Sequence, residues 1–327
     1  MSAAKSKLNV LITGANGFVG CALVNQLNAN SNFKPRAALR RVTSKIANNV
    51  EQILVAGLAE GADWSAALKN VDVIVHAAAR VHVMDDSAVE PLAEFRRVNV
   101  AGTLSLARQA VLADVKRFIF ISSIKVNGEV TFPAKPFKAD DEPAPVDPYG
   151  VSKLEAEKRL YELAADTDME IVIIRPVLVY GPGVKANFLR MMSWLDKGIP
   201  LPFGLICNKR SLVALDNLVD LIITCVDHPG ADNQIFLVSD GEDLSTTDIL
   251  RRMGDALGRR ARLISIPDWL LKSVAVVLGK SDISQRLFSS LQVDTDKTYS
   301  ILGWVPPVSV DDAFGKMVKQ FLEKQDL

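Results

Sequence analysis

Short apolar segments rich in β-branched residues alternate with longer amphipathic segments over the first half of the chain. Near-continuous apolar segments of this kind are typical of strands that a parallel sheet buries on both faces. The amphipathic segments have helical period, as in 90–113 and 149–164. The strand-like segments lie at 8–13, 36–39, 52–56, 71–77, 117–122 and 170–175.

Strands that alternate with helices predict an α/β fold, a doubly wound parallel sheet of the Rossmann type with ligands at the carboxyl ends of the strands. After residue 176 the alternation is less regular, and Gly and Pro interrupt segments 180–188 and 198–206. We therefore expect residues 1–176 to form mainly the sheet domain. Residues 177–327 are expected to form mainly a smaller C-terminal lobe for substrate, with some segments returning to the sheet domain.

Composition and charge indicate a globular protein and argue against several partners. Of the 327 residues, 49% are apolar and 23% are charged, and 38 basic residues balance 38 acidic ones. We therefore expect no nucleic-acid partner and no membrane partner. The sequence shows neither a signal peptide nor an apolar run of bilayer length, so we expect a cytoplasmic protein. The few cysteines and histidines are scattered, which predicts no disulfide framework and no metal site. They are Cys21, Cys207, Cys225, His76, His82 and His228.

A glycine-rich segment follows the first strand and opens the first helix. In "TGANGFVG" (13–20), a glycine recurs at every third position. Glycine permits a tight turn and the close approach of a pyrophosphate to the N–H groups at a helix N-terminus. The position of the segment predicts a dinucleotide site, although its spacing differs from the usual Gly-x-Gly-x-x-Gly, and an ordinary turn is the alternative. The expected contacts are Gly14, Asn16, Gly17, Phe18 and Val19.

The end of the second strand distinguishes between the two nicotinamide dinucleotides. An NAD site usually has an acidic residue there for the ribose 2′-hydroxyl, whereas an NADP site has an arginine for the 2′-phosphate. Here Arg40 and Arg41 follow the strand, and no acid is available. We therefore favour NADP(H), with NAD as the other possibility. Two solvated surface arginines are the simpler explanation of the same residues.

Tyr149 and Lys153 in "YGVSK" are spaced i, i+4, so both project from one face of a helix. A phenol has an unperturbed pKa of about 10, and a nearby ammonium or oxidised nicotinamide favours the phenolate. Such a tyrosine can exchange a proton with a carbinol or carbonyl oxygen while hydride moves. Alone, the pair is more often part of an ordinary surface helix. Downstream of a dinucleotide segment, it predicts proton transfer.

Several ordered motifs resemble the extended short-chain dehydrogenase/reductase family, which contains nucleotide-sugar epimerases, dehydratases and reductases. They are "TGANGFVG" (13–20), "HAAA" (76–79), "NVAGT" (99–103), "ISS" (121–123), "YGVSK" (149–153), "RPVLVYGPG" (175–183) and "LGW" (302–304). The resemblance covers nearly the whole chain, and the ordered set is far more specific than any one motif.

The resemblance implies roles for residues at matching positions. Tyr149 is the implied proton donor or acceptor, Lys153 binds the nicotinamide ribose and lowers the tyrosine pKa, and Ser123 bonds the reacting sugar oxygen. Leu58 stands near the place of an acid that commonly holds the adenine, so the contact there would be apolar or through the backbone. The remaining implied cofactor contacts are Ala77, Ala78, Ala79 and Pro176.

On the substrate side, the resemblance implies a nucleotide sugar, with UDP favoured. Asn187 resembles a family asparagine that contacts the diphosphate, and Arg210 resembles an arginine that clamps phosphate. A helix cap and a solvated arginine are the respective alternatives. Ser123 and Tyr149 would contact the sugar. The resemblance also implies a homodimer.

The family contains several reactions. Its dehydratases carry an Asp-Glu pair where this chain has Ile124 and Lys125, so dehydration is not expected, and Asn127 replaces a common tyrosine. Epimerases and reductases share the Ser-Tyr-Lys set. Because Arg40 favours NADP(H), which a reductase exchanges at each turnover, we expect reduction of a nucleotide-linked 4-keto sugar. The expected substrate is of the UDP-2-acetamido-2,6-dideoxy-4-keto-hexose type, used for surface polysaccharide. The alternatives are an NAD-dependent UDP-sugar 4-epimerase and a non-catalytic dinucleotide-binding relative.

Overall fold

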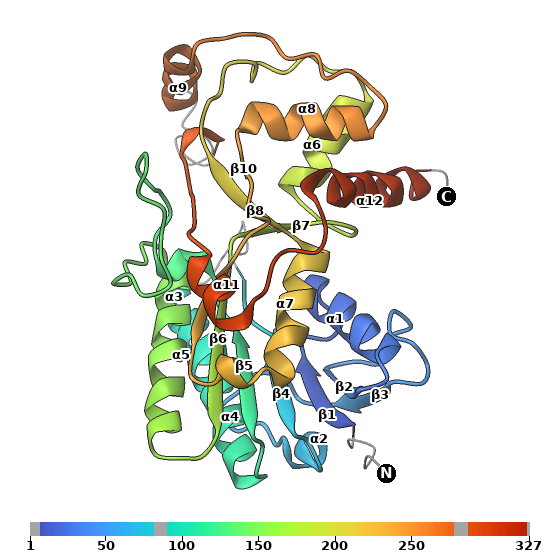
Figure 1. The fold of residues 1–327 in the computed structure, drawn as a ribbon, viewed down its shortest axis with the longest axis vertical. Helices are drawn as coiled ribbons and strands as arrows, with labels where there is room; N and C mark the ends of the chain where they lie inside the picture. Colours follow the sequence, from blue (N-terminus) through green and yellow to red (C-terminus); the bar gives the residue numbers. More distant parts are fainter. Residues whose placement is uncertain (1–6, 82–89, 278–286, 326–327) are drawn as a thin grey trace.

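The structure, a computed structural model, describes residues 7–81, 90–277 and 287–325. Seven parallel strands form the main sheet in the order β3-β2-β1-β4-β5-β6-β9 (Figure 1). They are Leu8–Thr13 (β1), Phe33–Leu39 (β2), Glu51–Leu54 (β3), Val73–His76 (β4), Arg117–Ile121 (β5), Glu170–Pro176 (β6) and Ile235–Val238 (β9). The order reverses between β1 and β4, the point at which doubly wound sheets bind ligands. The predicted fold class is confirmed.

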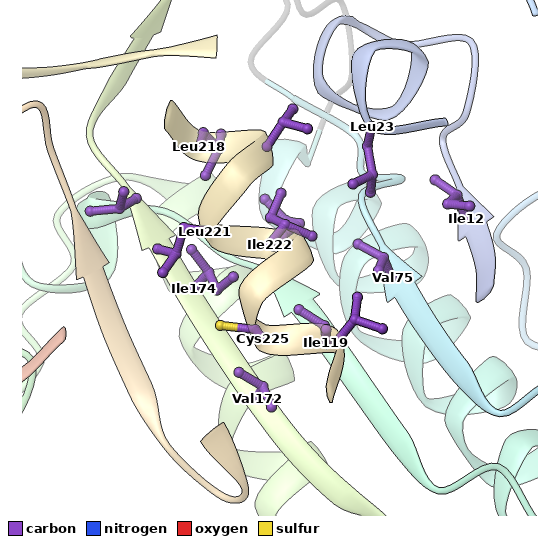
Figure 2. Packing of buried hydrophobic residues seen from close by; sticks show 14 of the residues in the cluster. Ile12, Leu23, Val75, Ile119, Val172, Ile174, Leu218, Leu221, Ile222 and Cys225 are labelled. Carbon is purple, nitrogen blue, oxygen red and sulfur yellow. The ribbon is translucent and has the colours of Figure 1, made fainter. Parts of the chain in front are cut away.

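One face of the sheet is covered by α1 (Phe18–Ala29) and α7 (Leu215–Asp227), which pack their apolar sides onto the strands (Figure 2). Leu23 of α1 and Ile222 of α7 belong to the same buried cluster as Val75 and Ile119 of the sheet. The two helices of this layer come from different halves of the chain. Helix α1 follows the first strand, whereas α7 follows the first strands of the C-terminal lobe.

The opposite face is covered by α2 (Ser65–Leu68), α4 (Thr103–Leu112) and α5 (Pro148–Ala165). Trp64, Leu106 and Leu160 form a second buried cluster there with strand residues such as Phe118 and Ile171. Because alternate side chains of the central strands enter the two clusters, these strands are apolar along most of their length.

The amphipathic run 90–113 is not one regular helix. It begins as α3 (Pro91–Phe95), continues as the π-helical segment η1 (Arg96–Gly102) and ends as α4. Within η1, Asn99 is buried and accepts a hydrogen bond from the Arg80 N–H at 2.8 Å, while its amide donates to Ser152 Oγ at 3.0 Å. Helices with π-type turns frequently mark functional sites.

The C-terminal lobe contains a small sheet in the order β10-β8-β7 (Figure 1). Its strands are Leu178–Tyr180 (β7), Arg210–Ala214 (β8) and Asp243–Leu244 (β10). Three helices enclose a third buried cluster with these strands. They are Asn187–Asp196 (α6), Thr246–Ala256 (α8) and Val310–Glu323 (α12).

Shorter segments complete the described chain. The helices α9 (Asp268–Val277) and α11 (Asp296–Leu302) and the 3-10 turns η2 (Ile124–Val126) and η3 (Pro229–Ala231) lie between the larger elements. Thr298 Oγ1 of α11 donates to the Leu237 carbonyl of β9 at 2.7 Å, which binds α11 to the edge of the main sheet. Within the described ranges, no helix is long and apolar enough to cross a bilayer.

Candidate active site

The turn between β1 and α1 needs glycine for steric reasons. Gly14 has a left-handed φ of 67°, and a Cβ there would lie 2.8 Å from the Ala78 nitrogen and 2.9 Å from the Ala77 carbonyl carbon. A Cβ at Gly20 would lie 2.3 Å from the Gly14 oxygen. The two strand ends and the helix therefore approach closely only because these positions have no side chain.

The N-terminus of α1 is open to a ligand. Gly17 caps the helix without a side-chain hydrogen bond, and the first turn contains no acidic residue. Asn16 and Gly17 are exposed, whereas Phe18 and Val19 are half-buried. Uncapped N–H groups at a helix N-terminus bind an anion, so this cradle fits the pyrophosphate of a dinucleotide.

The residues expected at the adenosine end lie at the ends of β2 and β3. Arg40 and Arg41 are exposed, and a Cβ at Gly57 would lie 3.4 Å from Arg40 Cδ, so the Arg40 side chain passes over this glycine. Leu58 is half-buried and packs closely against Gly102, where a Cβ would lie 2.9 Å from Leu58 Cβ.

A buried histidine connects the end of β1 to β4 and α4. His76 Nδ1 lies 2.8 Å from Thr13 Oγ1, and His76 Nε2 lies 3.0 Å from Thr103 Oγ1. The Ala78 N–H donates to Thr13 Oγ1 at 3.2 Å. Burial, and then the charge of Lys153, lower the His76 pKa to about 3. The ring is therefore neutral and structural, and it holds the half-buried Ala77, Ala78 and Ala79 beside the glycine turn.

Ser123, Tyr149 and Lys153 meet at the carboxyl end of β5. The Ser123 side chain lies beside the Tyr149 phenol, whose pKa it lowers, and the Tyr149 ring packs edge-on against Phe95 with centroids 6.0 Å apart. Lys153 is 1% exposed, and its Nζ donates to the Ile121 carbonyl at 2.7 Å. The same ammonium lies 4.0 Å from the centroid of the Phe120 ring.

The pKa shifts in this cluster differ from the sequence-based expectation. Burial, and then the charge of Asp147, raise the Tyr149 pKa to about 12, although the bond with Ser123 opposes the shift. Burial lowers the Lys153 pKa to about 7, against the opposing charge of Glu157. The protein's own groups therefore favour the neutral phenol. Favouring the phenolate near neutral pH requires additional positive charge beside Tyr149.

A charged network that sequence reasoning missed lies beneath the site. Glu157 accepts two hydrogen bonds from Arg175, at 3.0 Å from Nε and 2.6 Å from Nη2, and both side chains are 2% exposed. Ser122 Oγ also donates to Glu157, and Arg175 Nη1 donates to Asn127 Oδ1 at 3.0 Å. A signal was present in the sequence, because Glu157 continues the i, i+4 face of Tyr149 and Lys153 by one more turn.

This network explains the departure at Asn127. Asn127 stands where the family commonly has a tyrosine. The Asn127 side chain is instead buried and used internally, since its amide also donates to the Lys138 carbonyl at 2.9 Å.

The remaining predicted residues are distributed around the junction of the two parts. Pro176 is buried at the end of β6, and Asn187 is the exposed first residue of α6. Asn187 is not the cap of that helix, because the N-cap is Ala186, which makes no side-chain bond. Arg210 begins β8, where Nη1 donates to the Ser289 carbonyl at 3.2 Å and burial lowers its pKa.

One segment binds the lobe to the loop before α5. The Ser211 N–H of β8 donates to the Leu291 carbonyl at 2.8 Å, and the Thr131 N–H donates to the Ser290 carbonyl at 2.9 Å. Residues 290 and 291 therefore lie between β8, which begins at Arg210, and the loop that leads to Tyr149.

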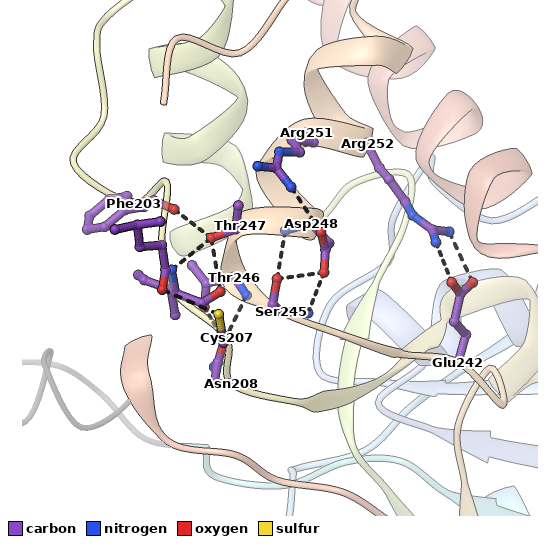
Figure 3. Close-up of polar contacts among 12 residues, drawn as sticks. Phe203, Cys207, Asn208, Glu242, Ser245, Thr246, Thr247, Asp248, Arg251 and Arg252 are labelled. Atoms are coloured by element: carbon purple, nitrogen blue, oxygen red, sulfur yellow. Dashed lines mark hydrogen bonds and ion pairs between the residues drawn. The ribbon is translucent and has the colours of Figure 1, made fainter. Parts of the chain in front are cut away.

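The lobe has a cavity of about 360 Å³ at the start of α8, lined by segment 204–209 and by residues of β10 and α8. Its polar groups bind one another (Figure 3). Thr247 Oγ1 donates to the Phe203 carbonyl at 2.6 Å, and the Thr246 N–H donates to Asn208 Oδ1 at 2.9 Å. These bonds fix segment 203–208 against the helix. His82 lies outside the described residues. No cluster of three metal-ligating side chains occurs in the described parts of the chain.

Comparisons with known proteins agree with the fold and the motifs. Residues 10–239 match the model of the NAD dependent epimerase/dehydratase family. A Vibrio cholerae protein named UDP-glucose 4-epimerase is 50% identical over 320 residues, covering 98% of this chain and 97% of the relative. The chain therefore belongs to the NAD dependent epimerase/dehydratase family, and the predicted family and enzyme class are confirmed.

More distant relatives share the fold and nearly the full length. An Escherichia coli O157:H7 protein, N-acetyl-alpha-D-glucosaminyl-diphospho-ditrans,octacis-undecaprenol 4-epimerase, is 26% identical, with 95% of this chain and 94% of that protein covered. The crystal structure of Thermotoga maritima UDP-glucose 4-epimerase with UDP-glucose has a TM-score of 0.79 at 21% identity, covering 97% of this chain and 100% of that one. Bacillus cereus UDP-glucuronic acid 4-epimerase with NAD gives 0.78 at 21%, covering 97% and 99%.

The expected 4-keto-sugar reductase is wrong. The relative at 50% identity is named a 4-epimerase, as are the two solved structures. The Ser-Tyr-Lys set is common to both reactions, so the expectation depended on Arg40 and on the missing acid at the end of the second strand. Exposed arginines at a strand end do not determine the reaction. The cofactor is NAD(P), and the preference for NADP(H) is not confirmed.

Proposed function

We propose that this protein is a 4-epimerase of a UDP-linked hexose that retains NAD as its cofactor. The observation that supports this most is the near-full-length identity of 50% with the Vibrio cholerae UDP-glucose 4-epimerase. Ser123, Tyr149 and Lys153, which the fold brings together at the end of β5, supply the proton-handling groups that the reaction needs.

Each residue of this cluster has a proposed role. Tyr149 takes the proton from the sugar hydroxyl that is oxidised and returns it after the sugar has turned. Ser123 bonds the same sugar oxygen, because its side chain lies beside the phenol. Lys153 bonds the nicotinamide ribose from its buried position on α5.

The cradle at the start of α1 would hold the pyrophosphate through the backbone of Gly14 to Val19. When bound, NAD⁺ would supply the hydride acceptor and a positive charge. The Tyr149 pKa of about 12 makes such a charge necessary for activity near neutral pH, because burial alone keeps the phenol neutral. Leu58, beyond the end of β3, would contact the adenosine, and Ala77 to Ala79, which follow β4 on the other side of β1, would contact the cofactor beside the glycine turn.

The C-terminal lobe, mainly residues 177–327, is proposed to hold the UDP group. Arg210 is a half-buried cation at the start of β8, and the exposed Asn187 is the first residue of α6. A guanidinium in this position suits a diphosphate. We also propose a homodimer, which light scattering on the purified protein tests.

The test is an assay of the purified protein with UDP-galactose, following formation of UDP-glucose. Y149F should reduce turnover by about 10²- to 10⁴-fold, the usual contribution of a positioned acid–base group, while the NAD content stays the same. Protein denatured after purification should release about one NAD per chain, because an epimerase does not need to exchange its cofactor. Release of NADP instead, or no interconversion with UDP-hexoses and UDP-N-acetylhexosamines, would contradict the proposal.

A further inference from the structure

Lys125 connects the loop that holds Ser123 to the helix that holds Tyr149. Its Nζ donates to Asp147, the N-cap of α5, and to Glu129 Oε1 at 2.8 Å. Its backbone N–H donates to Ser123 Oγ at 3.3 Å. Lys125 occupies one of the two positions where the dehydratases of the family carry acids, so its side chain has no role in the reactions considered so far.

The first turn of α5 lies directly against the backbone of this loop. Asp147 Oδ1 accepts from the Gly150 N–H at 2.6 Å. A Cβ at Gly150 would lie 2.9 Å from the Lys125 carbonyl oxygen and 3.1 Å from Asp147 Oδ1. The side chain of Lys125 therefore joins two segments whose backbones are already in close contact.

We propose that Lys125 is a positioning residue for proton transfer at Tyr149, because it holds the Ser123 loop against the first turn of α5 and neutralises the carboxylate two residues before the phenol. The proposal depends on the proposed function only for the reaction in which the phenol acts. The proposal explains why a lysine lies beside the N-cap of α5. A neutral cap residue such as serine would need no cationic partner there.

The charged and titratable groups around Tyr149 come from several elements. Among the described residues they are Asp147 and Lys153 on α5, Lys125 on η2, Glu129 on the loop that follows η2, and Arg80, whose guanidinium lies 5.7 Å from the centroid of the Phe95 ring that packs on Tyr149. Among the described residues, Asp147 is the acidic group whose charge raises the pKa of the phenol, second to burial.

Lys125 is protonated near neutral pH. Burial alone would lower the pKa of this lysine, but the hydrogen bonds to Asp147 and Glu129 outweigh burial, and the net shift is upward. Removing the ammonium would leave the Asp147 charge uncancelled beside the phenol. A nearby negative charge favours the neutral phenol, so the pKa of Tyr149 would rise further.

The central variants are K125M, K125R and D147N. Activity of the forward oxidation requires the phenolate, so it rises with pH through the phenol pKa. K125M should move this acidic limb of the kcat/KM profile upward by about one pH unit, and K125R should leave it near the wild-type position. D147N keeps an oxygen for the cap but removes the charge, so the limb should move downward. K125M combined with D147N should cancel the upward shift.

The control is K297M, which breaks the pair between Lys297 and Asp140 at 2.7 Å, with a similar lysine exposure of 25% against 29% for Lys125. It should leave the profile unchanged. A second readout does not need turnover: the phenolate absorbance of each variant is titrated with saturating NAD, against the same variant carrying Y149F. The phenol titration should shift with the acidic limb.

An equal loss of activity at every pH in K125M, with no movement of the phenol titration, would overturn the proposal, and so would a shift in K125R as large as in K125M. If K125M does not fold, D147N decides the matter, because an unmoved limb there contradicts the electrostatic role. Failure of epimerisation with a phenol titration that still responds to K125M would instead overturn the proposed function and leave the role of Lys125 supported.

Discussion

Two buried ionisable side chains one turn apart on α5, Lys153 and Glu157, have opposite kinds of partner. Glu157 is paired with Arg175 through two hydrogen bonds and also accepts one from Ser122. Lys153 is just as buried, but its Nζ bonds a carbonyl oxygen and lies over an aromatic ring. The first arrangement satisfies a charge completely, whereas the second leaves the lysine pKa lowered to about 7.

This difference distinguishes residues that stabilise the fold from residues that can take part in the reaction. A buried ion pair with all its hydrogen bonds made is electrostatically fixed, and removing one partner exposes the full desolvation cost of the other. A buried group without an opposite charge in contact has a shifted pKa and responds strongly to any charge that binds beside it. Lys153 and Tyr149 have this second character, and the network of Glu157 and Arg175 lies immediately below them.

The largest expected effect comes from breaking the satisfied network. R175M leaves Glu157 buried without its partner and should lower the free energy of unfolding by about 3–5 kcal/mol. Urea denaturation measures the change. The matched control is R159M on the same helix, where Arg159 and Glu162 are both 62% exposed and the loss should stay below about 0.5 kcal/mol. Similar losses in the two variants would refute the distinction between buried and exposed pairs.

For Lys153 we expect the opposite result, a small effect on stability and a large effect on activity. K153M removes a desolvated ammonium that contacts no carboxylate among the described residues, so the free energy of unfolding should change by less than about 1 kcal/mol. Epimerisation should still fall by at least about 100-fold, equivalent to about 2.7 kcal/mol, because the proposed bond from Lys153 to the nicotinamide ribose is lost and the cofactor is misplaced. Denaturation and a turnover assay on the same preparation test both parts. A large decrease in the free energy of unfolding would show that Lys153 also stabilises the fold.

The sequence was sufficient for six of the seven strands of the main sheet, because buried parallel strands have few polar interruptions, but β9 (Ile235–Val238) was not predicted. The six predicted segments correspond to β1 through β6, and β1 begins and ends at Leu8 and Thr13 as expected. The π-helical segment was not predictable, because it depends on tertiary contacts: Asn99 bonds the backbone of Arg80, and Gly102 packs on Leu58.

The candidate site was predictable as a set of positions but not as an electrostatic environment. The i, i+4 spacing placed Tyr149 and Lys153 on one helix face, yet "SKLEAEKRL" has the charge pattern of a solvated helix and does not show that Glu157 is buried. The extent of burial decides the pKa directions. Burial raised the pKa of the phenol and lowered that of the lysine, the reverse of a charged lysine acidifying a tyrosine.

The smallest effect concerns His76, which is buried like Glu157 but satisfied in the neutral form by Thr13 and Thr103. Its folded pKa of about 3 lies below the value of about 6.5 in the unfolded chain, so between these values the unfolded state binds the proton. Stability from this group is therefore complete above pH 6.5 and decreases as the pH falls.

Between pH 7 and pH 5.5, His76 should account for a loss of about 1 kcal/mol in the free energy of unfolding. H76N removes this titration, and although its stability at pH 7 should be lower because both threonine bonds change, its curve should be flatter by that amount. Urea denaturation at several pH values measures the two slopes. Parallel slopes would mean that the imidazole takes up a proton while the protein stays folded. The fold would then tolerate a charged His76 at the end of β4, whereas it does not tolerate an unpaired Glu157.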